Sequence, residues 1–351
     1  MRRYILAASI AVMLMLSIPL CSYAGGYVTH VLSSPVSSYS WAYDINDSGQ
    51  VVGTVACYDP YDVSAVLWND FNANPQSLDE ESKSSNALLI NNSGTVIGKH
   101  ESPPGSMMPF KWTASSGVTN IDVSFNPEAV NGSGTMVGWA TAPDIQQVPV
   151  VVSSTGGVTY LDYTCGNGGI ARDINDSGYI AGDSYAPVWG GHACLWYGED
   201  VVDLGAFGGT WSSALEINNS GQVVGVYGGD EGAIGNLIWS SSTETIFIPA
   251  CSLLDSGSFG PVDINNNGVV LGNAEMNGVD TVVTWSLTGG FTVVGTGIAY
   301  AINNSGWIVG ISDLNDSQAV VWEPVPEPSA FVALACGLVG ILTRTRKRPN
   351  L

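Results

Sequence analysis

The sequence has little positive charge. It contains 10 Lys and Arg residues against 31 Asp and Glu residues. Six of the basic residues stand at the two ends. The chain between Arg3 and Arg344 therefore holds four basic and 31 acidic residues, a formal charge of −27. Phosphate groups are bound by clustered Lys and Arg side chains. This composition excludes a nucleic-acid-binding function and disfavours binding to anionic lipid.

Residues that carry common catalytic motifs are also scarce. His30, His100 and His192 are the only histidines. None stands in a motif that pairs a nucleophile with a base, so we expect all three to be polar surface residues. A glycosidase needs only two carboxylates, which keeps that alternative open. A sialidase needs an arginine cluster, and Arg172 is the only arginine between the ends. The sequence predicts that the protein is not an enzyme.

Cysteines are few, and none forms a zinc motif. Cys21 and Cys336 lie in the terminal segments, which leaves four in the interior, Cys57, Cys165, Cys194 and Cys251. Four cysteines allow three disulfide pairings, and the sequence does not choose among these pairings and free thiols. No CxxC or Cys/His cluster indicates a zinc site.

The N-terminus has the parts of a secretory signal peptide. Two arginines precede an apolar run over residues 4–20, and Ser22 and Ala24 supply small residues three and one positions before a cleavage site. We expect cleavage after Ala24, so that residues 1–24 form the signal peptide. A lipoprotein with lipid on Cys21 is the alternative.

One phrase of about ten residues occurs seven times. In every copy an asparagine is followed by a glycine three positions later and by a second glycine seven positions later. The asparagines are Asn46, Asn91, Asn131, Asn175, Asn218, Asn265 and Asn303. Their spacings are 45, 40, 44, 43, 47 and 38 residues. Self-similarity at this period indicates a repeated supersecondary unit.

Each phrase predicts a β-hairpin, because four turn residues separate two apolar segments. The asparagine side chain hydrogen-bonds its own backbone, and the first glycine, Gly49 in the first copy, allows a positive φ. This combination predicts a type I turn with a glycine bulge. The second glycine, Gly53 in the first copy, is expected where neighbouring backbones approach closely.

A second repeated feature is an apolar strand that ends in tryptophan about twenty residues after each asparagine. The members are Trp68, Trp112, Trp196, Trp239, Trp285 and Trp322, with Val152 in the third copy. A shorter strand follows, as in the segments from Gly117 and Gly157. Four short strands in about 43 residues are typical of a propeller blade. We expect these tryptophans to pack between blades.

The sequence therefore predicts an all-β protein, a seven-bladed β-propeller over residues 25–323. The seventh copy runs into a proline-rich segment without a fourth strand, and the segment Gly26–Leu32 is expected to supply it. A ring closed in this way leaves no exposed edge strand. A β-solenoid, built from shorter coils with distinct capping repeats, is the alternative.

Two segments resemble known families. The segment Asp203–Gly225 resembles the extracellular HAF family of repeats, through Asp203-Leu204-Gly205, Gly208-Gly209 and the phrase that follows. That family implies secretion and little about activity. The C-terminus resembles the PEP-CTERM sorting signal, since Val325, Pro326, Glu327 and Pro328 precede an apolar run and then the basic residues Arg344, Arg346, Lys347 and Arg348.

The second resemblance implies an address and a partner. Such tails are recognised by an exosortase in Gram-negative bacteria that make exopolysaccharide. Residues 324–329 would be the linker with the sorting motif, and residues 330–351 the apolar segment with its basic tail. The apolar run of about 13 residues is short for a spanning helix of roughly 20, which favours a transient membrane anchor. Basic residues after it would stay on the inner side.

Calcium is the one cofactor that the sequence suggests. Three copies place oxygens at alternating positions before a glycine, as calcium loops do. The candidate ligands are Asp44, Asn46, Asp173, Asn175, Asp263 and Asn265. Against calcium, Leu89 and Ala129 hold the first position in other copies, and Val55 stands where the bidentate acid would be. Turn chemistry explains the phrase without a metal.

Two functions of different classes fit these features. The first is a non-enzymatic acidic propeller, exported to the cell envelope, the outer surface or the extracellular matrix, with polysaccharide or surface proteins as further partners. The second is a carbohydrate-binding propeller, with or without glycosidase activity. Aromatic residues outside the repeated series could stack on sugars: Trp41, Trp139, Trp189, Trp211 and Trp307. Several of these on one face would favour the second function.

Overall fold

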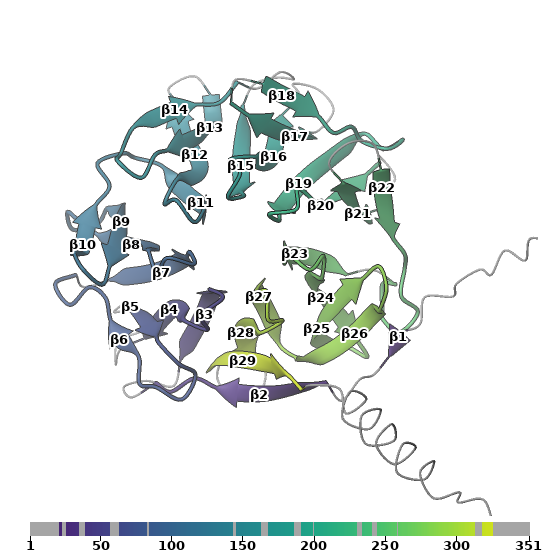
Figure 1. Ribbon diagram of the computed structural model, residues 1–351, viewed down its shortest axis with the longest axis horizontal. Coiled ribbons are helices and arrows are strands. Elements are labelled where there is room, and N and C mark those ends of the chain that lie inside the picture. Colours follow the sequence, from purple (N-terminus) through teal and green to yellow (C-terminus); the bar gives the residue numbers. More distant parts are fainter. Residues whose placement is uncertain are drawn as a thin grey trace, which may run out of the picture.

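Seven small sheets are arranged in a ring in the computed structural model (Figure 1). The structure describes residues 21–22, 26–34, 39–56, 63–82, 84–142, 145–162, 168–185, 191–198, 200–229, 234–240, 244–257, 259–312 and 318–325. Every sheet contains one copy of the repeated phrase, at the turn between its first two strands. The predicted all-β, seven-bladed propeller is confirmed, and a solenoid is excluded.

The first four blades each contain four antiparallel strands that follow one another in the chain. Blade 1 consists of β3 (Ser40–Ile45), β4 (Val51–Ala56), β5 (Val63–Trp68) and β6 (Gln76–Ser77). Blade 2 consists of β7 (Ser85–Ile90), β8 (Val96–Glu101), β9 (Met107–Thr113) and β10 (Gly117–Asn120). Blade 3 consists of β11 (Asn126–Val130), β12 (Met136–Ala142), β13 (Ile145–Val152) and β14 (Val158–Tyr160). Blade 4 consists of β15 (Gly169–Ile174), β16 (Ile180–Tyr185), β17 (Gly191–Tyr197) and β18 (Asp200–Asp203).

The last three blades repeat this order, with additions from the N-terminus. Blade 5 consists of β19 (Trp211–Ile217), β20 (Val223–Gly228), β21 (Ile234–Ser240) and β22 (Glu244–Ile248). Blade 6 consists of β23 (Gly260–Ile264), β24 (Val270–Met276), β25 (Val279–Ser286) and β26 (Gly290–Thr296), and β1 (Cys21–Ser22) pairs parallel to its outer strand. Blade 7 consists of β27 (Ile298–Ile302), β28 (Ile308–Ser312), β29 (Gln318–Pro324) and β2 (Tyr27–Val31).

The two ends of the described chain close the ring in blade 7. Strand β2 pairs antiparallel with β29, with Thr29 opposite Trp322 and Val31 opposite Val320 (Figure 1, purple beside yellow). The amide of Leu32 continues the ladder to the carbonyl of Ala319 at 2.9 Å. The predicted closure by the N-terminal strand is confirmed, although β2 is shorter than the predicted segment by one residue at each end. An edge strand that would otherwise be exposed is covered.

The repeated turn has the predicted geometry. In blade 1 the amide of Gly49 donates to the carbonyl of Asn46 at 3.0 Å, and the φ of Gly49 is 78°. The first strand then carries a bulge between Ala42 and Asp44. Because of that bulge, a Cβ on Gly53 would lie 1.8 Å from the carbonyl oxygen of Trp41. Only glycine fits there, which explains the second repeated glycine.

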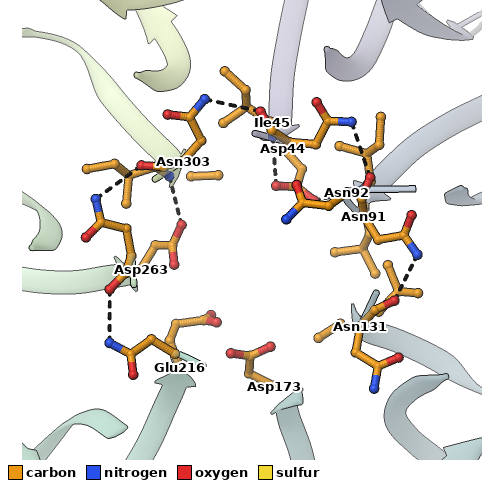
Figure 2. Close-up of a pocket in the computed structure, with 18 of the residues that line it drawn as sticks. Asp44, Ile45, Asn91, Asn92, Asn131, Asp173, Glu216, Asp263 and Asn303 are labelled. Carbon is orange, nitrogen blue, oxygen red and sulfur yellow. Dashed lines mark hydrogen bonds between the residues drawn. The ribbon is translucent and has the colours of Figure 1, made fainter. Parts of the chain in front are cut away.

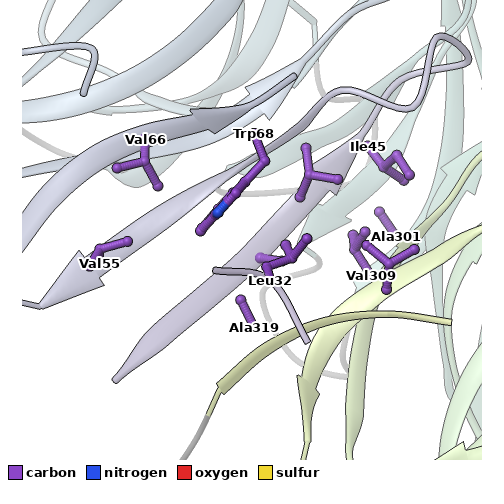
Figure 3. Close-up of a cluster of buried hydrophobic side chains, with 11 residues drawn as sticks. Leu32, Ile45, Val55, Val66, Trp68, Ala301, Val309 and Ala319 are labelled. Carbon is purple, nitrogen blue, oxygen red and sulfur yellow. The ribbon is translucent and has the colours of Figure 1, made fainter. Parts of the chain in front are cut away.

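The core lies between adjacent blades and contains the repeated tryptophans. All six are buried, with exposed fractions from 0% for Trp68 to 7% for Trp112, and Val152 is fully buried. Each occupies the same position, opposite the first residue of the second strand, as in the pairs of Val51 with Trp68 and Ile180 with Trp196. Figure 3 shows Trp68 in a cluster that combines blade 1 with Leu32 and blade 7. The predicted packing role is confirmed.

The predicted terminal segments lie mostly outside the described residues. Within the described ranges, no helix is long and apolar enough to cross a membrane. Residues 1–20 of the predicted signal peptide and residues 326–351 of the predicted sorting region are not described, whereas β1 falls inside the predicted signal peptide. Cys251 is buried and forms a disulfide, so the interior cysteines are not all thiols.

Candidate functional site

The central channel is the first candidate site in the described part of the chain. The first strands of the seven blades surround a cavity of about 590 Å³. Its wall consists of the ends of these strands and the repeated turns that follow them. A cavity of this size falls in the range of small-molecule sites. Figure 2 shows side chains from all sides of the ring pointing into it or along its wall.

The seven repeated asparagines form a closed ring of hydrogen bonds around this channel. In each blade the side-chain Nδ2 donates to the backbone carbonyl of the asparagine in the next blade, at distances between 2.8 and 3.3 Å. The last link joins Asn303 to the carbonyl of Asn46 at 3.1 Å and completes the circle. All seven side chains are buried. The asparagine therefore joins neighbouring blades as well as forming its own turn.

The same side chains also cap their own turns. The Oδ1 of Asn218 accepts the amides of Ser220 and Gln222, both at 3.0 Å. The other six asparagines accept the equivalent pair of amides. Aspartate would supply the acceptor for the cap but not the donor for the ring. Since both functions need an amide, asparagine is the residue that this position requires.

A second, exposed ring lies at the mouth of the channel. It is formed by the residues that directly follow the repeated asparagines. The backbone amide of such a residue donates to a side-chain oxygen of the equivalent residue in the next blade, as from Asp47 to Asn92 and from Asn304 to Asp47. Six such links are present. The seventh is absent because the counterpart in blade 3 is Gly132, which has no side chain.

Four of the carboxyl groups that line the channel come from equivalent positions of the repeat. They are Asp44, Asp173, Glu216 and Asp263, two residues before the asparagines of blades 1, 4, 5 and 6. Each aspartate uses both oxygens. Oδ1 of Asp44 accepts the amide of Ile45, and Oδ2 accepts the amide of Ile90 in the next blade, both at 2.7 Å. Asp173 and Asp263 make the equivalent two contacts, one within the blade and one with the next blade.

Burial of these groups near one another favours their protonated forms. Burial raises the pKa of Asp44 to about 6 and that of Asp263 to about 7, although the backbone amides oppose this rise. Burial also raises the pKa of Asp173. The pKa of Glu216 is raised well above its usual value, by burial and then by the negative charges of Asp173 and Asp263. Glu216 is hydrogen-bonded to Asp173 (labelled side by side in Figure 2), and this bond raises the pKa of Glu216 and lowers that of Asp173.

The calcium candidates are spread around the ring in three blades. Asp44, Asp173 and Asp263 already accept two backbone amides each, and Asn46, Asn175 and Asn265 use Oδ1 in the turn caps. Within the described residues, no group of three or more His, Cys, Asp or Glu side chains is arranged to hold a metal ion. A cation would have to displace these hydrogen bonds. The interpretation from the sequence, turns that need no metal with calcium as the weaker alternative, stays a prediction.

The histidines lie away from the channel, and one differs from expectation. His30 contacts Glu323 across β2 and β29 at 2.8 Å, and His192 contacts Asp203 at 2.8 Å. His100, however, is 7% exposed and not on the surface, with its Nδ1 2.6 Å from Asp79. The sequence could not show this, because Asp79 is 21 residues away and meets the histidine only in the folded blade.

Three of the additional tryptophans share one face of the propeller. Trp41 and Trp211 stand at the start of a first strand. Trp139, on the second strand of blade 3, lies opposite Asn126, the first residue of its first strand, and so at the same end of the blade. All three are half-buried, and Nε1 of Trp139 donates to Glu128 at 2.9 Å. Trp307 follows the repeated turn on the opposite face. Trp189 lies outside the described residues.

The sorting residues are almost all outside the described chain. Val325 is the last described residue; it is 43% exposed, and its amide donates to the carbonyl of Gly26 at 2.6 Å. Pro326, Glu327, Pro328, Arg344, Arg346, Lys347 and Arg348 are not described. The predicted sorting motif would therefore begin where the ring closes, beside Gly26.

Comparison with known proteins identifies the fold alone. No protein-family model and no curated protein sequence matches the chain. Among solved structures, the chain is similar to the β-propeller domain of the Trilobed protease from Pyrococcus furiosus, with 11% identity, a TM-score of 0.55, and coverage of 82% of this chain and 94% of that one. That propeller is described as having an open velcro topology, whereas here β2 and β29 close the ring.

Two further similarities support the same architecture. The acylaminoacyl peptidase of Pyrococcus horikoshii matches with 10% identity and a TM-score of 0.57, over 84% of this chain and 53% of that one. This chain therefore spans about half the length of that peptidase. YCF48 bound to D1 peptide matches with 14% identity and a TM-score of 0.52, over 88% of this chain and 99% of that one.

Proposed function

We propose that the protein is a non-enzymatic, acidic β-propeller that is exported and sorted to the cell envelope or the exopolysaccharide matrix. The observation that carries the proposal is that side chains facing the channel are bonded to the backbone of the propeller itself. The aspartates and asparagines that face the cavity are bonded to backbone amides and carbonyls of neighbouring blades. A catalytic carboxylate needs an oxygen available to substrate. These oxygens serve the scaffold instead.

The charge and the ends of the chain support the address. An interior with a formal charge of −27 repels anionic surfaces and keeps a secreted domain soluble. The disulfide of Cys251 suits an oxidising compartment outside the cytoplasm. The resemblance of residues 325–348 to the PEP-CTERM signal supplies the partner, an exosortase-type enzyme, with the membrane holding the tail before processing.

Localisation in a Gram-negative host that makes exopolysaccharide tests this proposal. The full chain should be recovered in the envelope or matrix fraction, and a chain that ends at Pro324 should be released without attachment. Replacing Arg344, Arg346, Lys347 and Arg348 by Gln should have the same effect, because it removes the positive end of the tail. An identical distribution of all three chains would refute the sorting role.

Carbohydrate binding is the second candidate, and a specific observation favours it. Trp41, Trp139 and Trp211 lie on one face, and Trp41 is stacked with Tyr39, a residue that is 44% exposed. Aromatic side chains with one exposed face suit the apolar face of a sugar ring. The host exopolysaccharide is the first ligand to test, together with a glycan array. Binding that is lost in Trp139→Ala but kept in Trp307→Ala would support this function. Absence of binding to every glycan would exclude it.

A further inference from the structure

Blade 3 lacks the tryptophan that every other blade has. Val152 faces Met136 across β12 and β13, as Trp68 faces Val51 and Trp196 faces Ile180. The valine is fully buried, but its side chain is much smaller than an indole. The surroundings of Val152 can therefore be compared with those of the tryptophans in the other blades.

The indoles of four other blades have similar surroundings. Each shares a cluster with the apolar residue that follows the outer strand of the preceding blade: Leu32 for Trp68, Leu78 for Trp112, Leu161 for Trp196 and Leu204 for Trp239. Each cluster also contains the side chain before the tryptophan position of that preceding blade, such as Val321 for Trp68. These two contacts and the facing residue of the second strand form the walls of an indole site.

Three of the indoles also donate a hydrogen bond to the preceding blade. Nε1 of Trp68 donates to the carbonyl of Ser33 at 2.9 Å, and Nε1 of Trp196 to that of Asp162 at 2.6 Å. Nε1 of Trp239 donates to the carbonyl of Leu204 at 3.2 Å. The site in each of these blades thus recognises both the ring and its N–H group.

Between blades 2 and 3 the same walls surround a cleft. The counterparts of the three wall residues are Ile121, Lys111 and Met136, and all of them line a cavity of about 540 Å³. Ile121 is equivalent to Leu161, since the amides of both donate to a third-strand proline carbonyl, at 3.0 and 2.9 Å. Asp122, the counterpart of the acceptor Asp162, lines the cleft as well.

We propose that this cleft binds a planar aromatic ring that carries an N–H donor, of which indole is the simplest. The buried side chains of Ile121 and Met136 provide the apolar floor, and the backbone at Asp122 provides the acceptor. Lys111 stands where five of the other blades have an apolar residue. Its Nζ donates to the carbonyl of Ser154, which also lines the cleft, at 3.3 Å, and from there the ammonium can lie over the face of a bound ring. The site is separate from the channel and independent of the proposed sorting.

Methyl NMR of the full chain, labelled at methionine, tests the proposal directly. Titration with indole should shift the Met136 methyl signal to saturation, because that side chain lines the cleft. The methyl of Met276, on β24 in blade 6, is the internal control and should not move. An unmoved Met136 signal, or equal shifts of all methionines, would overturn the proposal.

A variant that supplies the missing ring gives the second test. Val152→Trp should fill the cleft from within and abolish the indole-dependent shift. Val158→Trp, on the neighbouring strand β14 where the side chain is 38% exposed, adds a tryptophan elsewhere and should bind indole as the wild type does. Unchanged binding by a folded Val152→Trp would overturn the proposal. If that variant does not fold, the titration of the wild type still decides.

Matched ligands test the N–H donor. 3-Methylindole and 1-methylindole have the same size, but only the first can donate. We expect 3-methylindole to bind about three- to tenfold more tightly, the effect of one neutral hydrogen bond. Equal affinities, or the reverse order, would contradict the assignment of the backbone acceptor.

Discussion

Removing one asparagine from the closed ring should destabilise the whole propeller. The side-chain amide group of Asn218 makes four hydrogen bonds: two that cap its turn, one to the side chain of Gln222 and one to the backbone carbonyl of Asn265 in blade 6. Its side chain is 3% exposed, so water does not replace these partners in Asn218→Ala. At about 1 kcal/mol for each bond, the free energy of unfolding should fall by roughly 3–4 kcal/mol.

The next residue provides a matched control. Asn219 makes two side-chain hydrogen bonds to Asp176, but it is exposed at the mouth of the channel. Water can take over both partners in Asn219→Ala, so we expect a loss below about 1 kcal/mol. Urea-induced unfolding of both variants gives the comparison. A loss in Asn218→Ala that is no larger than in Asn219→Ala would refute the structural role of the ring.

Three further predictions concern packing, closure and pH. Trp196→Ala should lower the free energy of unfolding by about 3–5 kcal/mol in chemical denaturation, and a loss under roughly 1 kcal/mol would mean that the indole is not a core residue. Deleting residues 26–32 should expose the edge of β29, lower the melting temperature and promote aggregation; a monomer that melts within a degree or two of the wild type would show that closure does not depend on β2. Stability should decrease as the pH rises from about 4 to 7, because Asp44 and Asp263 hold their protons more tightly when folded, with pKa values of about 6 and 7. The slope should reach about 1.4 kcal/mol per pH unit for each group, and denaturation curves that show rising stability over this range would contradict it.

The repeated residues made most of the fold predictable. The spacing of the asparagines gave seven blades, and the tryptophans gave the inter-blade core, because both follow from local patterns that recur. Closure by residues 26–32 could be inferred from the missing fourth strand of the seventh copy. Each of these conclusions needed only neighbouring residues and the rule that edge strands are covered.

The interactions between blades could not be predicted in the same way. The turn alone accounts for the Oδ1 of Asn46, and nothing in the sequence shows that Nδ2 reaches the carbonyl of Asn91, 45 residues away. The aspartates resembled calcium ligands because their oxygens alternate, yet Asp44 uses both oxygens on amides of two blades. The pairing of Glu216 with Asp173 likewise depends on the geometry of the ring.

Hydrogen exchange tests the closed ring most directly. The side chain of each repeated asparagine accepts a hydrogen bond from the backbone amide four residues later. These amides belong to Gln50, Thr95, Thr135, Tyr179, Gln222, Val269 and Trp307. In a closed ring no blade is an end, so all seven amides should exchange only through global unfolding, with free energies that agree within about 1 kcal/mol. Exchange at Gln50 and Trp307 that is much faster than at Tyr179 would show that blades 1 and 7 separate, and would contradict a ring closed by β2 and by the contact of Asn303 with Asn46.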